Sequence, residues 1–310
     1  METKNVQARK KVKQLHIPRF LFWSGGADST YMMLRLFEEG IRVDKIFFSD
    51  TGKEFPEMYE YVEKVKAFMM RKYEVEIHHF HPKEGRDYKS FSREVGFIRG
   101  EDKVRGIPRQ LEPCWLQRNT KIRPFEYWLT ANQVKDHLVY IGYTADELKR
   151  AKMKVRSNNE KELKKIEALE GEERSIALEK LVKKFVTGVN QIINNNHIYP
   201  LIIWDIEGDQ VKVELQKRGM LNPLYKHFDR TGCFMCPKVG EDTYYKLWKF
   251  HPKQWKWMKK EEKRMRKLQA FGDQFNKDET IKEMETRFEK SGYNPEIRST
   301  TEQDFCFCVI

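Results

Sequence analysis

The segment Ser24–Thr30 has the residue types of a phosphate-binding loop. It contains Ser-Gly-Gly-Ala-Asp-Ser-Thr, follows a short apolar run and opens a stretch with helical spacing. Glycines let successive backbone N–H groups approach phosphate oxygens, and the first turn of a helix adds partial positive charge. The pattern differs from GxxxxGK[ST] and from GxGxxG, which disfavours a Walker-type kinase or GTPase and weakens a dinucleotide interpretation. An ordinary βα turn without a ligand is the alternative.

Three cysteines form a second group with chemical potential. Cys233-x-x-Cys236 is followed by Pro237, a spacing typical of zinc and iron–sulfur ligand turns, and Cys114 adds a third thiol. A redox-active CxxC pair and buried, inert cysteines are the alternatives. We predict that Cys114, Cys233 and Cys236 are metal ligands.

The formal net charge of +12 belongs to two segments. Residues 1–19 hold six basic residues and one acidic residue, and residues 238–270 hold eleven and four. Because the rest of the chain is neutral as a set, we expect a polyanionic partner, with a solvated helix face as the alternative. Aromatic residues between the lysines of the second segment could stack on nucleic-acid bases. We expect some of its large side chains to pack in the core instead: Leu247, Trp248, Trp255 and Met258.

The elements that must position these groups alternate between short apolar runs and helical patterns. Strands are predicted at 20–23, 45–48, 75–80 and 138–141, and the core pattern restarts at 198–203. Helices are predicted from residue 31 up to Gly40, at 58–68, and at 119–133 with Pro124 in the first turn. This β-α-β-α alternation predicts a Rossmann-like parallel sheet with helices on both faces.

The remaining segments depart from this alternation. Residues 82–113 are polar and rich in Gly and Pro, so we expect a long loop. Residues 151–196 are charged and have helical spacing, which predicts a helical insert. The resulting domain prediction is a basic arm at 1–19, a nucleotide-binding domain at 20–237 that contains the insert, and a basic, helical C-terminal region with a cysteine-containing tail at 238–310.

Several motifs resemble those of the PP-loop ATP pyrophosphatases, also called adenine nucleotide α-hydrolases. SGGADS at 24–29 resembles their SGGxDS loop, and DTGKEFPE at 50–57 resembles the DTGxxFPE stretch of the phosphoadenosine phosphosulfate (PAPS) reductase branch. Further matches follow in order: Cys114 with Lys121 and Pro124, GYTADE at 142–147, Tyr199-Pro200-Leu201 with Trp204, NPLY at 222–225 and RTGCFMCP at 230–237. The resemblance spans about residues 18–260 and implies a Rossmann-like fold of the HUP type.

The resemblance also implies a site for ATP and Mg²⁺ at the carboxyl ends of the parallel strands. The residues expected to hold phosphates are Ser24, Gly25, Gly26, Asp28, Ser29 and Thr30. The expected catalytic residues are Ser24, Asp28, Ser29 and Arg230. Further nucleotide contacts are expected from Asp50, Thr51, Gly142, Tyr143 and Lys121, and Lys149 and Arg150 are additional phosphate candidates. A helix N-cap is the alternative role of Asp50.

Enzymes of this superfamily typically cleave ATP between the α- and β-phosphates, and sulfur can then displace the adenylated oxygen. Some members that insert sulfur hold a [4Fe–4S] cluster, so the three cysteines would bind three irons and leave one open, with zinc as the alternative. DNA-phosphorothioation relatives use a fourth cysteine soon after the CxxC pair, but residues 237–250 contain none, so Cys306 or Cys308 is the candidate. PAPS reductases use a cysteine in an ECG-type tail, from which Asp304-Phe305-Cys306 departs.

We therefore hypothesise an ATP pyrophosphatase that adenylates a nucleic-acid oxygen for sulfur incorporation. DNA phosphorothioation is favoured over an RNA substrate, and a cysteine desulfurase is the expected sulfur donor. The alternatives are PAPS or APS reduction, tRNA thiolation and nucleotide binding without catalysis. No apolar run approaches the ~20 residues of a membrane helix, no apolar segment follows the basic N-terminus, and five cysteines are too few for a disulfide scaffold. We expect a cytoplasmic protein without a membrane partner.

Overall fold

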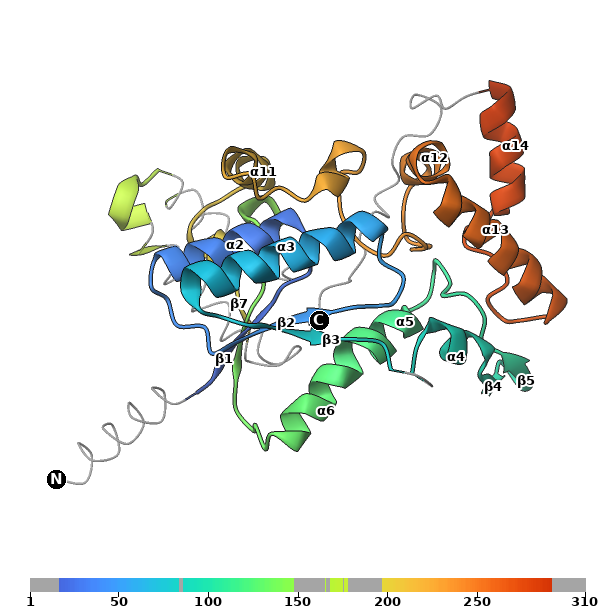
Figure 1. Cartoon of the computed structure of the whole chain (residues 1–310), viewed down its shortest axis with the longest axis horizontal. Helices are drawn as coiled ribbons and strands as arrows, with labels where there is room; N and C mark the ends of the chain where they lie inside the picture. Colours follow the sequence, from blue (N-terminus) through green and yellow to red (C-terminus); the bar gives the residue numbers. More distant parts are fainter. Residues whose placement is uncertain are drawn as a thin grey trace. The chain divides into compact units, whose positions relative to one another are not determined.

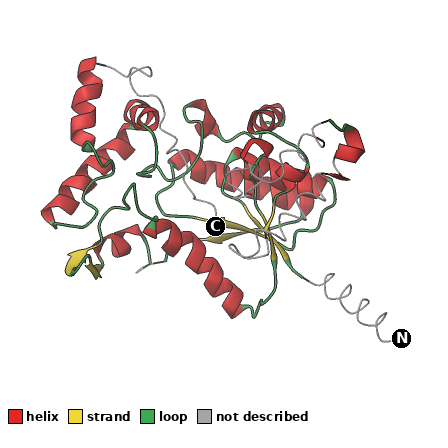
Figure 2. Cartoon of the chain, turned by 180° about the vertical axis from the view of Figure 1, so that it is seen from behind, coloured by secondary structure: helices red, strands yellow, loops and turns green. Residues whose placement is uncertain are grey.

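The computed structural model describes residues 17–83, 86–147 and 197–291, together with 165, 168–174, 176 and 177 (Figures 1 and 2). Most of the predicted arm at 1–19 and of the predicted insert at 151–196 lies outside the described residues. The same holds for Lys149, Arg150, Cys306 and Cys308.

A five-stranded parallel sheet forms the core, in the order β3-β2-β1-β6-β7. Its strands are β1 (Arg19–Phe22), β2 (Lys45–Ser49), β3 (Ile77–Phe80), β6 (Leu138–Tyr140) and β7 (His197–Ile198). β1 lies in the centre and pairs in parallel with β2 and with β6. The chain runs outward in opposite directions from β1, so the strand order reverses between β1 and β6, the place where open α/β sheets bind ligands. The predicted Rossmann-like class is confirmed.

Helices flank this sheet and bury their apolar residues. The first are α2 (Ala27–Glu38) and α3 (Pro56–Tyr73), followed later by α10 (Pro200–Ile203) and α11 (Gly208–Lys217). Met32 and Met33 of α2 are fully buried, as are Val211 and Leu215 of α11. Figure 1 shows α11 beside α2, and Arg218 after α11 bonds the Glu38 carboxylate at 2.8 Å. These contacts fix α2, and with it the position of the loop that precedes α2.

The prediction of one long loop at 82–113 was wrong. This segment contains α4 (Tyr88–Arg93) and a hairpin of β4 (Val95–Ile98) and β5 (Glu101–Val104). Asp87 caps α4 by accepting a hydrogen bond from the Ser90 backbone N–H at 2.8 Å. Arg99 and Gly100 both have positive φ, as a tight hairpin turn requires. The polar and glycine residues of this segment therefore form turns between a helix and two strands, and do not indicate one continuous loop.

The helix predicted at 119–133 begins earlier than expected. α5 (Trp115–Gln117), the π-helical segment η1 (Arg118–Ile122) and α6 (Arg123–Ala131) follow one another without a break. Pro124 therefore lies inside a helical run and not in its first turn. A proline has no N–H to donate and crowds the carbonyl one turn back, and a local π-helical turn relieves that conflict.

The C-terminal region is helical, as predicted. It contains α12 (Glu241–Phe250), α13 (Pro252–Lys267) and α14 (Ile281–Ser291), with a non-helical connection between the last two. Leu247, Trp255 and Met258 are buried, and the Trp248 ring packs 5.7 Å from that of Phe288. The predicted place in the core is confirmed for Leu247, Trp255 and Met258, whereas Trp248 is half-buried. Among the described residues, no helix is both long enough and apolar enough to cross a membrane.

The structure separates into two compact units. The first contains the residues up to Phe48, Val65–His78 and Asn132–Asn222, and the second contains Ser49–Lys64, His79–Ala131 and the residues from Pro223 onward. The phosphate-type loop belongs to the first unit and the three cysteines of the described chain belong to the second. The domain boundaries at 19/20 and 237/238 stay a prediction.

Candidate functional sites

The loop Ser24–Thr30 connects β1 to α2 and is ordered by its own hydroxyl groups. The Ser24 backbone N–H donates to the Ser29 Oγ at 3.2 Å, and the two serine Oγ atoms lie 3.0 Å apart. The Thr30 hydroxyl donates to the Gly26 carbonyl at 2.7 Å and accepts from the Trp23 indole N–H at 2.8 Å. Ser29 and Thr30 are buried, whereas Ser24 is exposed. The loop is thus preformed, with Ser24 on its open side.

Backbone conformation gives this loop the properties of an anion site. Gly25 has φ +76°, which favours glycine, and Gly26 is the N-cap of α2. Gly26, at the N-cap position, makes no side-chain capping hydrogen bond, and the first turn of a helix carries partial positive charge that favours an anion. Asp28 supplies a carboxylate in that same turn. The arrangement suits a phosphate accompanied by a cation.

Two distant residues fix the loop from outside. The buried Asn222 side chain donates to the Gly25 carbonyl at 2.9 Å. Gly142, which follows β6, lies so close that a Cβ there would meet the Ser29 backbone N and Cα at 3.0 Å. The structure thus brings Gly142 to the phosphate loop at the reversal of strand order. Asn222 was visible in the sequence only as part of NPLY, and its role as a clamp was missed.

Tyr143 and Tyr199 form a stacked pair beside the same strand ends. Their ring centroids are 5.7 Å apart and the rings are nearly parallel, at 7°. Burial, and secondarily the neighbouring Tyr143, raises the pKa of Tyr199 to about 12, so its hydroxyl stays neutral. The predicted nucleotide residue Tyr143 is therefore a half-buried aromatic surface. Its contact with a nucleotide stays a prediction.

In the second unit, the three cysteines line a single cavity. The other residues in its wall are Thr51, Pro108, Leu116, Gln117, Lys121, Met235 and Pro237. Cys114 caps the helical run at α5, with its sulfur 3.5 Å from the Gln117 N–H, and the Cys236 N–H donates to the Cys233 carbonyl at 3.1 Å. All three thiols are free and partly buried. Residues more than a hundred positions apart are thereby brought together, as the metal-ligand prediction requires.

Electrostatics around the thiols opposes their ionisation. Burial raises the pKa of Cys233 well above its usual value, and Glu54 adds to this while Lys121 acts against it. Burial also raises the pKa of Cys236, which Arg230 partly offsets. The structure therefore places Lys121 and Arg230 where they act on thiols, and their predicted roles toward phosphate stay predictions. Cysteines in this environment are neutral until a cation binds them.

Asp50 and Thr51 follow β2 and have different neighbours. The Thr51 hydroxyl donates to Glu54 at 2.7 Å, and the Cys233 thiol lies 3.2 Å from the Thr51 oxygen. Asp50 accepts from the Gly52 N–H at 2.7 Å and from the Tyr59 hydroxyl at 3.1 Å. Burial opposes ionisation of Asp50, but the neighbouring His79 and the hydrogen bonds from Gly52 and Tyr59 outweigh it and lower its pKa. Asp50 is thus an ionised carboxylate, and Thr51 belongs to the wall of the thiol cavity.

A row of lysines marks the exposed face of α13. The five lysines at helical spacing are Lys253, Lys256, Lys260, Lys263 and Lys267, and all are exposed. Successive spacings of three and four residues place them on one side of the helix. Other basic residues of the region bind acids instead, including Lys259 with Glu285 and Arg264 with Glu261. Among the described residues, no acidic partner pairs with these five, which we call the lysine row.

The fold and these sites define an α/β protein with a preformed glycine-containing loop at the start of α2 and a cavity lined by three thiols. Residues 18–239 match the family described as the phosphoadenosine phosphosulfate reductase domain. The chain therefore belongs to this family, the PAPS reductase-like branch of the PP-loop superfamily.

Two further similarities are more distant. The chain is 28% identical over 256 residues to the uncharacterised protein MJ0066 of Methanocaldococcus jannaschii, an alignment that covers 80% of this chain and 42% of that protein. The chain thus spans less than half the length of that relative. The U34-tRNA thiolase NcsA from Methanococcus maripaludis, solved with its [4Fe-4S] cluster, is 13% identical with a TM-score of 0.35, over 66% of this chain and 58% of that one. At this distance the likeness carries no argument about function.

Proposed function

We propose that this chain is a PP-loop ATP pyrophosphatase that adenylates a nucleic-acid oxygen for sulfur incorporation, with DNA phosphorothioation as the favoured reaction. The observation that carries the proposal is the preformed loop Ser24–Thr30 at the N-terminus of α2, fixed by Asn222 and by the close approach of Gly142. Such a loop holds phosphates through backbone N–H groups and hydroxyls, without needing a lysine.

The proposed reaction is an in-line displacement at the α-phosphorus of ATP. A substrate oxygen forms a bond to that phosphorus, the bond to the bridging oxygen breaks, and pyrophosphate leaves with the electron pair. Positioning and charge stabilisation dominate such a step. Ser24, Ser29 and the N–H groups of the first turn of α2 would hold the phosphates, and Asp28 would hold the accompanying Mg²⁺. A sulfur nucleophile then attacks the substrate atom that carries the adenylated oxygen, the bond between that atom and the oxygen breaks, and the oxygen leaves as part of AMP.

The thiol cavity suits the sulfur half of this reaction. Cys114, Cys233 and Cys236 would hold a [4Fe–4S] cluster, which supplies an open iron for sulfur when bound. A zinc ion is the alternative occupant of the same three thiolates.

A nucleic-acid partner is proposed from the lysine row of α13. On this helix Trp255 and Met258 are buried and Trp257 is half-buried, so its exposed face offers mainly charge. Such a face would bind the phosphate backbone without reading bases. The preference for DNA over RNA and the cysteine desulfurase as sulfur donor belong to this same proposal.

The direct test supplies anaerobically purified full-length protein with Mg²⁺, ATP and a cysteine desulfurase with cysteine, and offers DNA or tRNA in parallel. We expect sulfur to appear in DNA as a phosphorothioate linkage that survives nuclease digestion. Sulfur found only in tRNA would reject the DNA assignment, and sulfur in neither nucleic acid would reject the proposal. A brown colour with broad visible absorption in the purified protein is the expected sign of the cluster.

The second candidate is a sulfonucleotide reductase, which the family match favours. In that reaction a cysteine sulfur attacks the sulfonate of PAPS or APS, the S–O bond to the nucleotide breaks, and a second thiol releases sulfite as a disulfide forms. Sulfite release in a thioredoxin-coupled assay would support this function. Its loss in Cys306→Ser or Cys308→Ser would then locate the nucleophile, whereas loss in Cys233→Ser alone would assign it to the CxxC pair.

A further inference from the structure

Two histidines and an aspartate meet where β2 and β3 end. Asp50 directly follows β2, and His79 and His81 lie two residues apart at the end of the neighbouring strand β3. Side chains two residues apart along a strand point to the same face. The Asp50 N–H donates to the Phe80 carbonyl at 3.1 Å, which fixes the two strand ends in register. The backbone itself therefore brings the three side chains together.

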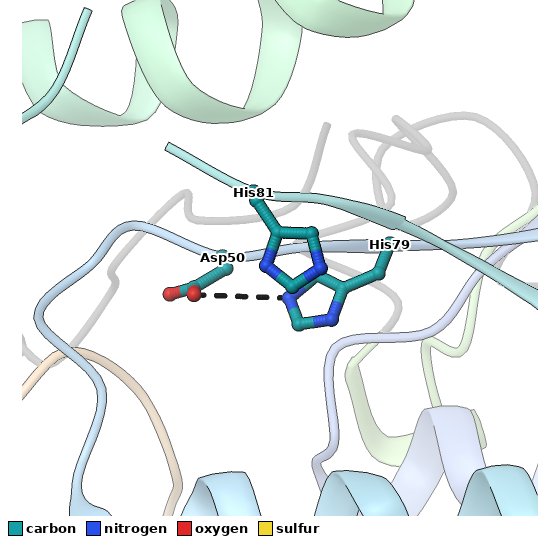
Figure 3. A group of neighbouring side chains, drawn as sticks. All are labelled: Asp50, His79 and His81. Atoms are coloured by element: carbon teal, nitrogen blue, oxygen red, sulfur yellow. Dashed lines mark ion pairs between the residues drawn. The ribbon is translucent and has the colours of Figure 1, made fainter. Parts of the chain in front are cut away.

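The Asp50 carboxylate is oriented toward the imidazoles. Its Oδ1 accepts hydrogen bonds from Gly52 and Tyr59, which leaves Oδ2 directed at His79, 3.7 Å from the Nε2 atom (Figure 3). The His79 and His81 rings stack with centroids 3.6 Å apart. One ligand atom from each residue lies within 4.8 Å of the other two. Two ligands of one tetrahedral zinc ion lie roughly 3.3 Å apart, so small side-chain rotations would close this set around a cation.

The three side chains differ in how far they are buried. The side chains of Asp50 and His79 are only 6% and 8% exposed, whereas His81 is exposed. A cation held here would be anchored on its buried side and open to solvent beside His81. Three protein ligands with an open position are the arrangement of metal sites that bind a water or a substrate oxygen.

We propose that Asp50, His79 and His81 form a site for a divalent first-row transition metal such as Zn²⁺. The set of two imidazoles and one carboxylate matches the preference of these metals and differs from the all-oxygen sets that Mg²⁺ and Ca²⁺ prefer. It is chemically distinct from the thiol cavity, because it contains no sulfur. The open position suits a water molecule or a phosphate oxygen as the fourth ligand. Asp50 then acts as a metal ligand and not as the direct nucleotide contact that the sequence predicted.

The test separates this site from the cysteines. Full-length protein carrying Cys114→Ser, Cys233→Ser and Cys236→Ser is stripped of metal and titrated with Zn²⁺ by calorimetry, alone and with His81→Ala added. His81 is the variant of choice because it is exposed and its loss leaves the core intact. His78→Ala is the matched control, because this imidazole lies on the same strand with the opposite orientation and packs against Phe47.

We expect the thiol-free protein to bind one Zn²⁺, and His81→Ala to weaken that binding by more than the roughly 10- to 100-fold that the loss of an outer partner costs. His78→Ala should bind as its parent does. Absence of Zn²⁺ binding to the thiol-free protein, or equal binding with and without His81, would overturn the proposal.

A second measurement covers the case in which the triple cysteine variant does not fold. Co²⁺ is added to the otherwise unsubstituted chain and to its His81→Ala variant, and the two visible spectra are subtracted. The proposal predicts a difference spectrum with ligand-field bands and no thiolate charge-transfer band. Identical spectra would overturn it. Neither measurement depends on ATP turnover, so failure here is distinguishable from failure of the proposed pyrophosphatase activity.

Discussion

Single residues hold the loop Ser24–Thr30, the proposed phosphate loop, in its observed conformation. The loop bonds within itself through Ser24, Ser29 and Thr30, but Gly142 and Asn222 come from distant parts of the chain. The loop itself was predictable from the sequence, because glycine and hydroxyl residues between a predicted strand and a predicted helix are typical of such a loop. The clamp was not, because the Asn222–Gly25 bond joins residues 197 positions apart and depends on the tertiary fold.

Substitution of Gly142 by alanine tests the part that this residue plays in holding the loop. The added Cβ would meet the Ser29 backbone at 3.0 Å, so the loop must shift. We expect ATP affinity to fall by about tenfold or more and the free energy of unfolding to fall by about 1–3 kcal/mol, the typical cost of overpacking. Calorimetric ATP titration and urea unfolding measure the two effects. Gly96→Ala, with open space around its Cβ, is the control. Unchanged ATP binding by Gly142→Ala would contradict the role given to this close approach.

The sequence also did not predict the role proposed here for the histidines at the end of β3. The segment Ile77–Phe80 was predicted correctly as part of a strand, but its histidines received no role. The available signal was a His-x-His pair at a strand end beside another strand that ends in an aspartate. Recognising it requires the strand order β3-β2, which is a property of the sheet and not of the segment.

At the scale of elements, α13 has a buried apolar face and an exposed basic face. Its large apolar side chains enter the core while the lysine row stays exposed, and helical periodicity alone was enough to predict this division. The hairpin β4–β5 was missed because its turn rests on Arg99 and Gly100 at positive φ, and only the glycine signals such a conformation. The π-helical turn before Pro124 could not be predicted either, because it depends on how the helix adjusts around a proline that cannot donate a backbone hydrogen bond.

Neutralising the lysine row tests the nucleic-acid surface. We expect Lys253→Gln, Lys256→Gln, Lys260→Gln and Lys263→Gln together to weaken DNA binding on the order of tenfold and to spare ATP binding. The slope of log K against log salt should fall by about 0.9 for each duplex phosphate that the variant no longer neutralises. Fluorescence anisotropy over a salt series measures both.

A charge-matched variant provides the control for that experiment. It removes four exposed lysines from other elements: Lys64, Lys89, Lys282 and Lys290. Equal weakening by the two variants would mean that net charge attracts DNA without a defined surface, and would contradict the role of the lysine row.

A buried carboxylate of α13 bonds the connection that leads to α14 and is pH-sensitive. Glu262 accepts hydrogen bonds from the Phe275 and Ile281 N–H groups at 3.0 and 2.8 Å, and burial outweighs them to raise its pKa to about 7. A carboxylic acid whose pKa is raised on folding stabilises the protein below its unfolded value, about 4.5, and this contribution is lost as pH rises through about 7. Glu262→Gln should therefore flatten the decline of Tm between about pH 5 and pH 8. Glu289→Gln, at an exposed position on α14, is the control, and an unchanged pH profile in Glu262→Gln would contradict this assignment.

For the whole molecule, the excess positive charge lies in two segments. The rest of the chain is neutral as a set, and the proposed phosphate loop would rely on backbone N–H groups, hydroxyls and the start of α2. The excess charge on α13 is then left for a larger polyanion. Motif order along the chain was enough to predict the family and the parallel sheet, because both depend on local segments in sequence. The thiol cavity adds residues from two distant segments, and its metal depends on chemistry that spacing alone does not specify.

The central claim is that this chain cleaves ATP between the α- and β-phosphates. The most direct measurement is the identity of the nucleotide products after incubation of the full-length protein with Mg²⁺ and ATP, with nucleic acid and a sulfur donor present or omitted. The proposed function predicts AMP and pyrophosphate in equal amounts, formed only when the acceptor nucleic acid is present. ADP with inorganic phosphate, or bound ATP that is never cleaved under any combination, would contradict it.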